Sequence, residues 1–196
     1  MNIIDYLKPK QKQLLKTVIL EKGQVLFHEL DVCKSIGIVI KGKVSIVSYL
    51  ENGKEIIYNQ LSENEIFGNN LIFSSSPYYK GNIISLVNSE IVLISKKDLI
   101  YLLRKNEEFM IEYLRIQSNF SKSLNNKIKL LSLDNAEERL LFYLHENKNV
   151  IAFASITNLA KQLHLERETL SRLISRLTKQ RKIKKERNRI ELLWWR

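Results

Sequence analysis

Residues 155–177 read SITNLAKQLHLERETLSRLISRL, and two apolar patterns of helical period follow one another within them. The first pattern is formed by Ile156, Leu159, Ala160 and Leu163. Ser155 stands just before it, where a hydroxyl can accept a hydrogen bond from a free amide of the first helical turn. These residues predict a short amphipathic helix that begins after Ser155.

The second pattern predicts another helix, with one apolar and one polar face. Its apolar stripe consists of Leu170, Leu173, Ile174 and Leu177. Its polar face carries Arg167, Glu168, Ser171 and Arg172. An arginine can bond a guanine through two donors and a glutamate can accept from the cytosine amino group, so such a face can read base edges. Two short helices joined by a tight turn, with this chemistry on the second, indicate a helix-turn-helix.

The simpler interpretation is a solvated charged face in an ordinary antiparallel helix pair. Two observations favour DNA binding instead. The polar residues gather at the start of the second helix, where a reader of the major groove needs them. Basic residues also continue along and past this helix, at Arg176, Lys179, Arg181, Lys182, Lys184 and Lys185.

Charge is unevenly distributed along the chain, whose net charge is +11 from 32 Lys+Arg and 21 Asp+Glu. From residue 155 onward there are 12 Lys+Arg and 4 Asp+Glu, so this last fifth carries +8 and the rest only +3. A basic segment on a nearly neutral body is typical of proteins that neutralise phosphates, and its binding should weaken with salt. A membrane surface would attract the same charge, but no apolar run approaches the roughly 20 residues that span a bilayer.

The first half of the chain reads as short strands rich in isoleucine and valine, at residues 24–27, 36–40, 43–49, 55–60, 83–86 and 90–95. Turn signals separate these strands. The strongest is Asn52-Gly53, because a type I′ hairpin turn needs two residues at positive φ. Many short antiparallel strands at this spacing indicate a sandwich or a barrel.

The apolar period then changes to that of a helix over residues 97–131. Its apolar positions are Leu99, Leu102 and Leu103, followed by Phe109, Tyr113, Ile116, Phe120, Leu124 and Leu131. A long helix with so narrow an apolar seam is best explained by a partner helix from a second copy of the chain. The alternative is ordinary packing of this helix against the β-domain.

The remaining segments complete an α+β organisation. Asp134, with Glu137 three residues later, resembles a capping box that starts a further helix. Beyond residue 177, residues 182–185 and 189–193 flank a turn at 186–188, which predicts the small hairpin of a winged helix. We expect an N-terminal domain over residues 1–105, a dimerisation helix over 106–133 and a DNA-binding domain over 134–196.

In this order the segments resemble the cyclic-AMP receptor protein and fumarate-nitrate regulator (Crp/Fnr) family of bacterial transcription factors. The resemblance spans about residues 19–193. It rests on VLFHELDVCKSIGIVIKGKVSIV (25–47), NGKEIIYNQLSENEIFG (52–68) with the NNLIF that follows, and LAKQLHLERETLSRLISRL (159–177). It implies an N-terminal β-roll or jelly-roll of the cyclic-nucleotide-binding type, a long dimerisation helix and a C-terminal winged helix-turn-helix.

The resemblance also implies roles for single residues. Arg167, Glu168 and Arg172 match the family's base readers, and Ser171 matches a further contact in some members. Phosphate contacts are expected at the start of the first helix and among the basic residues, namely Ser155, Thr157, Arg176, Lys179, Lys182, Lys184 and Lys185. His164 replaces the glycine that relatives usually have in the turn. A positive φ costs least for glycine, but histidine tolerates it better than most residues.

The candidate effector pocket departs from the family pattern; it consists of Gly68, Asn69, Asn70, Lys80 and Gly81. Relatives that bind cyclic AMP hold it with a Gly-Glu pair and an Arg-Ser pair. Here Asn69 stands for the glutamate, Lys80 for the arginine and Gly81 for the serine. Because a lysine lacks the guanidinium fork and an asparagine is neutral, we expect no response to cyclic AMP. Any effector would be another small molecule.

Few residues are candidates for an iron–sulfur cluster, a haem or a catalytic metal. An iron–sulfur sensor needs several cysteines, whereas Cys33 is the single cysteine, and it is best interpreted as a half-buried apolar residue rather than a redox switch. Haem ligands could come from His28, Cys33, Met110 or His145, but no spacing brings them together. His28 is the only histidine of the β-domain, so no metal-dependent enzyme is indicated. We expect no enzyme, metal or cofactor.

The sequence thus predicts a homodimeric transcription regulator that binds double-stranded DNA at a pseudo-palindromic site, with RNA polymerase as its protein partner. The N-terminal MNIIDYLKPKQK lacks the apolar core of a signal peptide, so we expect a cytoplasmic protein with no membrane partner. Two alternatives stay open. One is a constitutive regulator that needs no ligand, and the other is a module that binds RNA or an acidic protein without sequence specificity.

Overall fold

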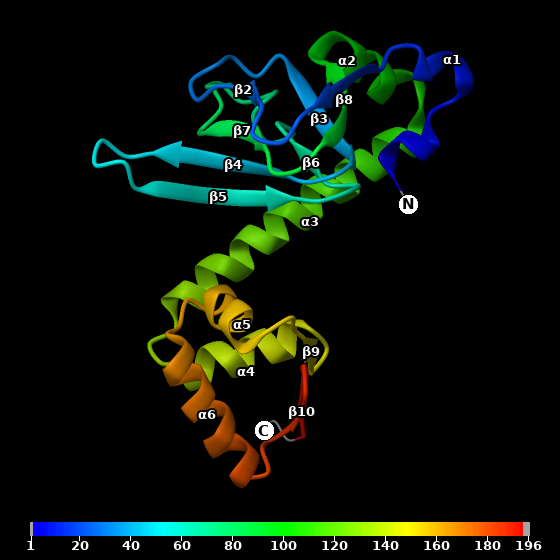
Figure 1. Ribbon diagram of the computed structural model, residues 1–196. Coiled ribbons are helices and arrows are strands. Elements are labelled where there is room, and N and C mark those ends of the chain that lie inside the picture. The colour runs from blue at the N-terminus through cyan, green and yellow to red at the C-terminus, as the bar shows by residue number, and fades with distance from the viewer. Residues whose placement is uncertain (1, 194–196) are drawn as a thin grey trace. The chain divides into compact units, whose positions relative to one another are not determined.

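The computed structural model describes residues 2–193, and the chain forms two compact units, Met1–Asn119 and Phe120–Arg196 (Figure 1). Residue 1 and residues 194–196 of the expected terminal domains lie outside the described residues. The boundary between the two units falls within the long helix α3 (Glu107–Ser132). The first unit is built mainly from strands and the second mainly from helices, so the expected α+β class is confirmed.

Two four-stranded antiparallel sheets form the first unit. One sheet has the order β1 (Lys16–Leu20), β8 (Ser89–Ser95), β3 (Ser35–Lys41) and β6 (Ile66–Phe67). The other has the order β2 (Val25–Phe27), β7 (Asn82–Ser85), β4 (Val44–Tyr49) and β5 (Glu55–Leu61). Ile36 and Ile91 of the first sheet share one buried core with Val44 and Ile83 of the second, which makes the unit a β-sandwich.

The six predicted strands correspond to β2, β3, β4, β5, β7 and β8. The hairpin between β4 and β5 differs from the prediction, because Gly53 has a positive φ of 77° and Asn52 does not. The Gly53 amide donates to the Leu50 carbonyl at 2.8 Å, and the Asn52 side chain accepts from the Lys54 amide at 3.0 Å. The prediction of a two-residue type I′ turn was wrong: the chain reverses over residues 50–54 with a single left-handed glycine.

Four helical segments accompany the sandwich: η1 (Ile3–Tyr6), α1 (Pro9–Lys12), α2 (Lys96–Lys105) and the start of α3. The helical period continues across residues 97–131, but the helix breaks at Asn106, where the backbone is extended. The Asn106 side-chain oxygen accepts from the Phe109 amide at 3.0 Å, in the first turn of α3. Its Nδ2 donates to the Tyr6 carbonyl at 2.9 Å and to Gln11 Oε1 at 2.8 Å. This buried amide therefore joins the start of α3 to the N-terminal segment.

Helix α3 buries part of the predicted seam within its own chain. Phe109 and Tyr113 belong to the core of the first unit, and Ile116 packs against that core. Phe120 is half-buried. The apolar residues of α3 that are exposed are Ile111, Leu114, Leu124, Ile128 and Leu131. Packing against the β-domain thus accounts for the N-terminal part of the seam, and Leu124, Ile128 and Leu131 form an exposed apolar row in the C-terminal part of α3.

The described part of the second unit contains the C-terminal part of α3, three further helices and a small sheet. The helices after α3 are α4 (Ala136–Glu146), α5 (Ile156–Gln162) and α6 (Arg167–Lys179). The strands are β9 (Val150–Ala152), β10 (Ile183–Glu186) and β11 (Arg189–Leu192), in the antiparallel order β10-β11-β9. Leu144 of α4, Leu159 of α5 and Leu170 of α6 meet in one buried core with Ile183 and Ile190 of the sheet.

The ends of these helices were predicted with mixed success. Ser155 is the N-cap of α5, as predicted, and its hydroxyl accepts from the Asn158 amide at 3.1 Å. The capping box at Asp134 was wrong. The N-cap of α4 is Asn135, whose side-chain oxygen accepts from the Glu138 amide at 2.9 Å. The prediction that His164 is a turn residue at positive φ is confirmed, since its φ is 52°.

Candidate nucleic-acid interface

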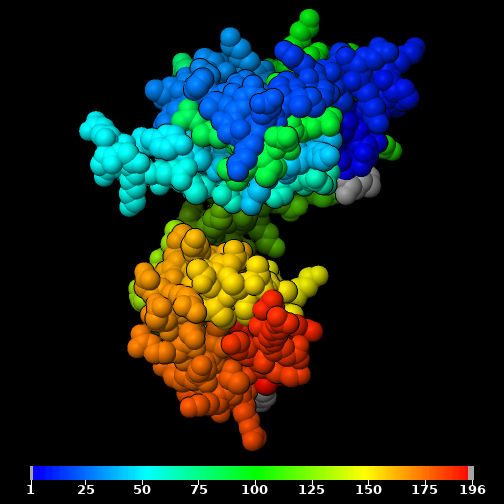
Figure 2. Space-filling model, viewed as in Figure 1, coloured from blue at the N-terminus to red at the C-terminus, as the bar shows by residue number. Residues whose placement is uncertain are grey.

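Helix α6 directs its polar face outward because its apolar stripe is buried. The buried residues are Leu170, Leu173, Ile174 and Leu177. The exposed residues include all four predicted base readers, Arg167, Glu168, Ser171 and Arg172. Positions four residues apart share one face of a helix, so these four side chains lie together over the first two turns of α6. Figure 2 shows α5, α6 and the C-terminal hairpin forming a continuous surface on the second unit.

The turn between α5 and α6 is fixed by hydrogen bonds on both sides. The Leu165 amide donates to the Ala160 carbonyl at 2.9 Å. Arg139 of α4 donates through Nη1 to the His164 carbonyl at 3.1 Å and through Nε to the Leu133 carbonyl at 3.1 Å. Because the turn is tied to α4 in this way, the polar face of α6 is presented at a fixed angle to the rest of the second unit.

The side chains of the predicted readers are free of internal ionic partners. Within residues 2–193, Arg167, Glu168 and Arg172 form no ion pair and no side-chain hydrogen bond, and the same holds for Lys179 at the end of α6. Their charges are therefore available to a molecule that docks on this face.

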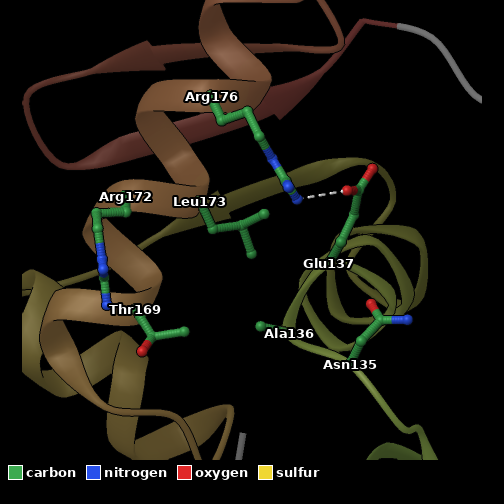
Figure 3. A pocket seen from close by; sticks show the side chains of 7 residues that line it. All are labelled: Asn135, Ala136, Glu137, Thr169, Arg172, Leu173 and Arg176. Atoms are coloured by element: carbon green, nitrogen blue, oxygen red, sulfur yellow. Dashed lines mark hydrogen bonds and ion pairs between the residues drawn. The ribbon is translucent and has the colours of Figure 1, made fainter.

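A groove of about 570 Å³ lies between the start of α4 and the face of α6 (Figure 3). It is lined by Asn135, Ala136, Glu137, Thr169, Arg172, Leu173 and Arg176. A second groove, of about 360 Å³, follows α6 itself and is lined by Ser171, Arg172, Ser175, Arg176 and Lys179. Arg172 and Arg176 belong to both grooves, so cationic side chains line each of these depressions.

Glu137, which lines the first groove, forms ion pairs with two cationic side chains. Its Oε2 accepts from Arg176 Nη2 at 2.7 Å, as Figure 3 shows, and its Oε1 accepts from Lys182 Nζ at 2.9 Å. The sequence suggested only a capping role for Glu137. Its actual partners lie on the last turn of α6 and in the turn before β10, so the contact was outside the reach of local pattern reasoning.

All seven predicted phosphate contacts are exposed. Ser155 and Thr157 lie at the start of α5, although the Ser155 hydroxyl is already bonded to the Asn158 amide. Lys184 on β10 is 3.1 Å from Glu186, and the hydrogen bond and charge of Lys184 lower the pKa of the Glu186 carboxyl. Three of the seven, Arg176, Lys182 and Lys184, are thus paired with carboxylates of the same unit.

The candidate effector residues are arranged differently. Asn69 is buried and donates through Nδ2 to Gln117 Oε1 on α3, while Gln117 Nε2 donates to the Asn69 carbonyl at 3.0 Å. Tyr113 also donates to that carbonyl, at 3.3 Å. The sequence did not single out Gln117. The Asn69 side chain, which we expected at the position of the family's ribose-binding glutamate, is therefore bonded to α3.

The other effector residues offer little to a phosphate. Gly68 has a φ of 77°, and a Cβ there would lie 3.0 Å from the Ser35 carbonyl, so the position requires glycine. Asn70 and Lys80 are exposed. Gly81 is buried, and a Cβ would lie 2.8 Å from the Val47 carbonyl oxygen. A side chain at position 81, where the resemblance leads us to expect a serine in nucleotide-binding relatives, would therefore require the Val47 backbone to shift.

Cys33 is more deeply buried than predicted, with 2% of its surface exposed. Its thiol lies 3.4 Å from the Ser35 carbonyl, and burial raises its pKa. Burial also raises the pKa of Tyr79, whose ring stacks on Phe27 in the same core. Since the thiolate is the reactive form of cysteine, this environment favours a structural side chain.

Two further properties concern residues 2–193. No group of three or more His, Cys, Asp or Glu side chains in this range could hold a metal ion. None of the helices in this range has both the length and the apolar character needed to cross a bilayer.

Comparison with known proteins adds the family context. Residues 17–106 match the cyclic nucleotide-binding domain. The search of curated proteins found no match. A solved transcriptional regulator from Thermotoga maritima is 25% identical, with a TM-score of 0.58, over 64% of this chain and 98% of that one.

Two other solved structures match nearly the whole chain. The Thermus thermophilus catabolite activator protein is 18% identical, with a TM-score of 0.57, over 97% of this chain and 92% of that one. A mutant of CooA from Carboxydothermus hydrogenoformans is 14% identical, with a TM-score of 0.67, over 98% of this chain and 91% of that one. Residues 17–106 are therefore similar to the cyclic nucleotide-binding domain, and the chain shares the fold of these solved proteins.

Proposed function

We propose that the chain is a transcription regulator that reads a specific DNA site through α6. In this proposal α5, α6 and the β9–β11 sheet act as a winged helix-turn-helix, and α6 enters the major groove. The observation that carries the proposal is the exposed face of Arg167, Glu168 and Arg172, whose charges have no ionic partner within residues 2–193.

The chemistry of this face supports direct readout. Each good bidentate contact between a side chain and a base contributes about 1–3 kcal/mol of discrimination. Arg167 and Arg172 would read guanine, and Glu168 would accept from a cytosine amino group. The exposed hydroxyls and cations around them, from Ser155 and Thr157 to Lys179 and Lys185, would contact phosphates and set the register.

We further propose that two copies act together as a homodimer. The exposed apolar row on α3, Leu124, Ile128 and Leu131, is the surface that a second copy would cover. Residues 1–105 would then be the effector domain, 106–133 the dimerisation segment and 134–196 the DNA-binding domain. A regulator of this design works on DNA in the cytoplasm and acts through RNA polymerase.

The test is selection of bound duplexes from a random-sequence pool by the full chain. We expect enrichment of two inverted half-sites whose centres are about one helical turn apart, or a multiple of it, each with a G·C pair. Equal affinity for random RNA and for the best duplex would overturn the proposal and favour a binding module without sequence specificity.

A second candidate is a regulator that is active without any ligand. The contact between Asn69 and Gln117 favours it, because the loop that would hold a nucleotide is already bonded to α3. The packing of Gly81 against Val47 favours it too, because a side chain at that position would require the Val47 backbone to shift.

A further inference from the structure

The carboxylate of Glu137 forms ion pairs with two cationic side chains, one on each oxygen. Arg176 Nη2 lies 2.7 Å from Oε2, and Lys182 Nζ lies 2.9 Å from Oε1. The Glu137 side chain is 26% exposed, so most of it is covered by its surroundings. Within residues 120–193, Glu137 is the carboxylate that forms ion pairs with two different lysine or arginine side chains, whereas Glu186 and Glu191 each pair with one.

Folding stability does not explain this arrangement well. The side chains of Arg176 and Lys182 are 57% and 47% exposed, and exposed ion pairs contribute little to stability because water and salt screen them. The ion pairs of Glu137 affect binding more than stability. A guanidinium or an ammonium that is paired with a carboxylate is less available to another oxyanion.

The oxyanion with which Glu137 competes follows from where the cations lie. Arg176 lines both grooves beside α6, together with the predicted base reader Arg172. Lys182 lies in the turn that leads from α6 to β10. Both cations are expected phosphate contacts. Carboxylates and phosphates use the same charge-assisted hydrogen bonds to arginine and lysine, so Glu137 occupies the role that a DNA phosphate would take.

We propose that Glu137 sets the DNA affinity of this chain by competing with phosphates for Arg176 and Lys182. The inference rests on the proposed function and names a residue that regulates it. Arg167, Arg172 and Lys179 have no such competitor within residues 2–193. The competition therefore falls on sequence-independent phosphate contacts and leaves the base-reading charges untouched.

The experiment compares Glu137→Gln with Glu138→Gln in the full chain. Glu138 is the matched control, since it is the next residue on α4, is exposed and forms no side-chain hydrogen bond or ion pair within residues 2–193. Both substitutions change the net charge by the same amount. Binding to a random-sequence duplex and to the selected site is measured by fluorescence anisotropy between 50 and 200 mM salt.

Glu137→Gln is expected to bind the random duplex more tightly than Glu138→Gln at low salt. Its affinity should also fall more steeply with salt, by about 0.9 in the slope of log K against log salt for each cation that is freed. Two freed cations would add about a tenfold loss of affinity between 50 and 200 mM salt. In an Arg176→Ala/Lys182→Ala background, Glu137→Gln should have no more effect than Glu138→Gln.

Equal affinities and equal salt slopes for the two single variants would overturn the inference. So would weaker binding by Glu137→Gln, because Glu137 would then hold its cations in place for DNA. In either case a wild-type chain that still selects a duplex site would leave the proposed function standing. If the wild-type chain binds no duplex, both the proposed function and this inference fail.

Discussion

At the scale of single residues, Arg172 is the side chain whose loss should be most informative. It lines both grooves beside α6 and has no ionic partner within residues 2–193. Arg172→Ala should reduce discrimination by about 1–3 kcal/mol at one base pair of each half-site and leave the others unchanged. Competition by duplexes that differ from the selected site at one position measures this.

Lys179→Ala is the control for Arg172→Ala, because Lys179 is an exposed cation at the other end of α6. It should weaken binding to all duplexes alike and lower the salt slope by about 0.9. If both variants lost affinity equally on selected and random DNA, the division into base readers and phosphate contacts would be wrong.

Asn69 leads to a prediction about cyclic AMP. Its amide donates to Gln117, and Lys80 is an exposed point charge in place of an arginine fork. Titration of the full chain with cyclic AMP should therefore give no binding heat, and the nucleotide should not raise Tm. A saturable increase in Tm would contradict the assignment, because a ligand that binds the folded chain stabilises it.

Residue roles were predictable where they follow from helical period. The faces of α6 follow directly from the spacing of Leu170, Leu173 and Leu177, so the exposure of Arg167 and Arg172 could be read from the sequence. The role of Glu137 could not, because its two partners are 39 and 45 residues away along the chain. Only the tertiary packing of α4 against α6 brings them together.

At the scale of elements, the break between α2 and α3 depends on Asn106. Asn106→Ala removes the bond to the Phe109 amide and the donor to the half-buried Tyr6 carbonyl, while Gln11 Oε1 keeps its bond from the Lys8 amide. Loss of a cap costs about 0.5–2 kcal/mol, and each buried polar group left without a partner costs about 1–3 kcal/mol. We expect the free energy of unfolding to fall by about 2–4 kcal/mol, as measured by urea denaturation and circular dichroism.

The control for Asn106→Ala is the same substitution at Asn119, which is exposed on α3 and makes no side-chain hydrogen bond within residues 2–193. Asn119→Ala should change stability by no more than about 0.5 kcal/mol. A similar small effect of Asn106→Ala would mean that the buried amide is dispensable for the junction.

Element boundaries were predictable where local patterns are strong. Six strands carry enough isoleucine and valine between turn residues to be recognised. Strand β1 was missed because most of Lys16–Leu20 is exposed, and β6 was missed because it has only two residues. The break at Asn106 interrupts a continuous helical period, and its partners Tyr6 and Gln11 lie 100 and 95 residues away.

At the scale of the whole molecule, the exposed apolar row on α3 leads to a prediction about assembly. Ile128 is 66% exposed, the most of the three residues in that row. Ile128→Asp should convert a dimer into a monomer in sedimentation equilibrium and weaken binding to a two-half-site duplex far more than to a single half-site. The reason is that a charge in an apolar contact must be desolvated without a partner.

Asn119→Asp is the matched control for Ile128→Asp. It introduces the same charge on the same helix, nine residues away, which is two and a half turns and so the opposite side. This variant should stay dimeric. A wild-type chain that is monomeric at the concentrations at which it binds DNA would remove the α3 row from the proposed dimer.

The order of the parts was the most predictable property of the whole molecule. The change from a strand period to a helical period in the nineties, and the two amphipathic patterns after residue 155, marked the sandwich, the long helix and the helix pair. Which apolar residues of α3 are buried and which are exposed was less predictable, because Phe109 and Ile128 have the same apolar character. Only the fold decides that the first is buried and the second exposed.

Gly81 limits which side chains can be introduced at its position. A serine introduced there would place its Cβ within 2.8 Å of the Val47 carbonyl oxygen, which belongs to β4 and cannot move like a flexible side chain. Introducing a serine would thus require a change in the backbone of β4. In a directed-evolution experiment, single substitutions at position 81 should therefore be selected against through their loss of stability.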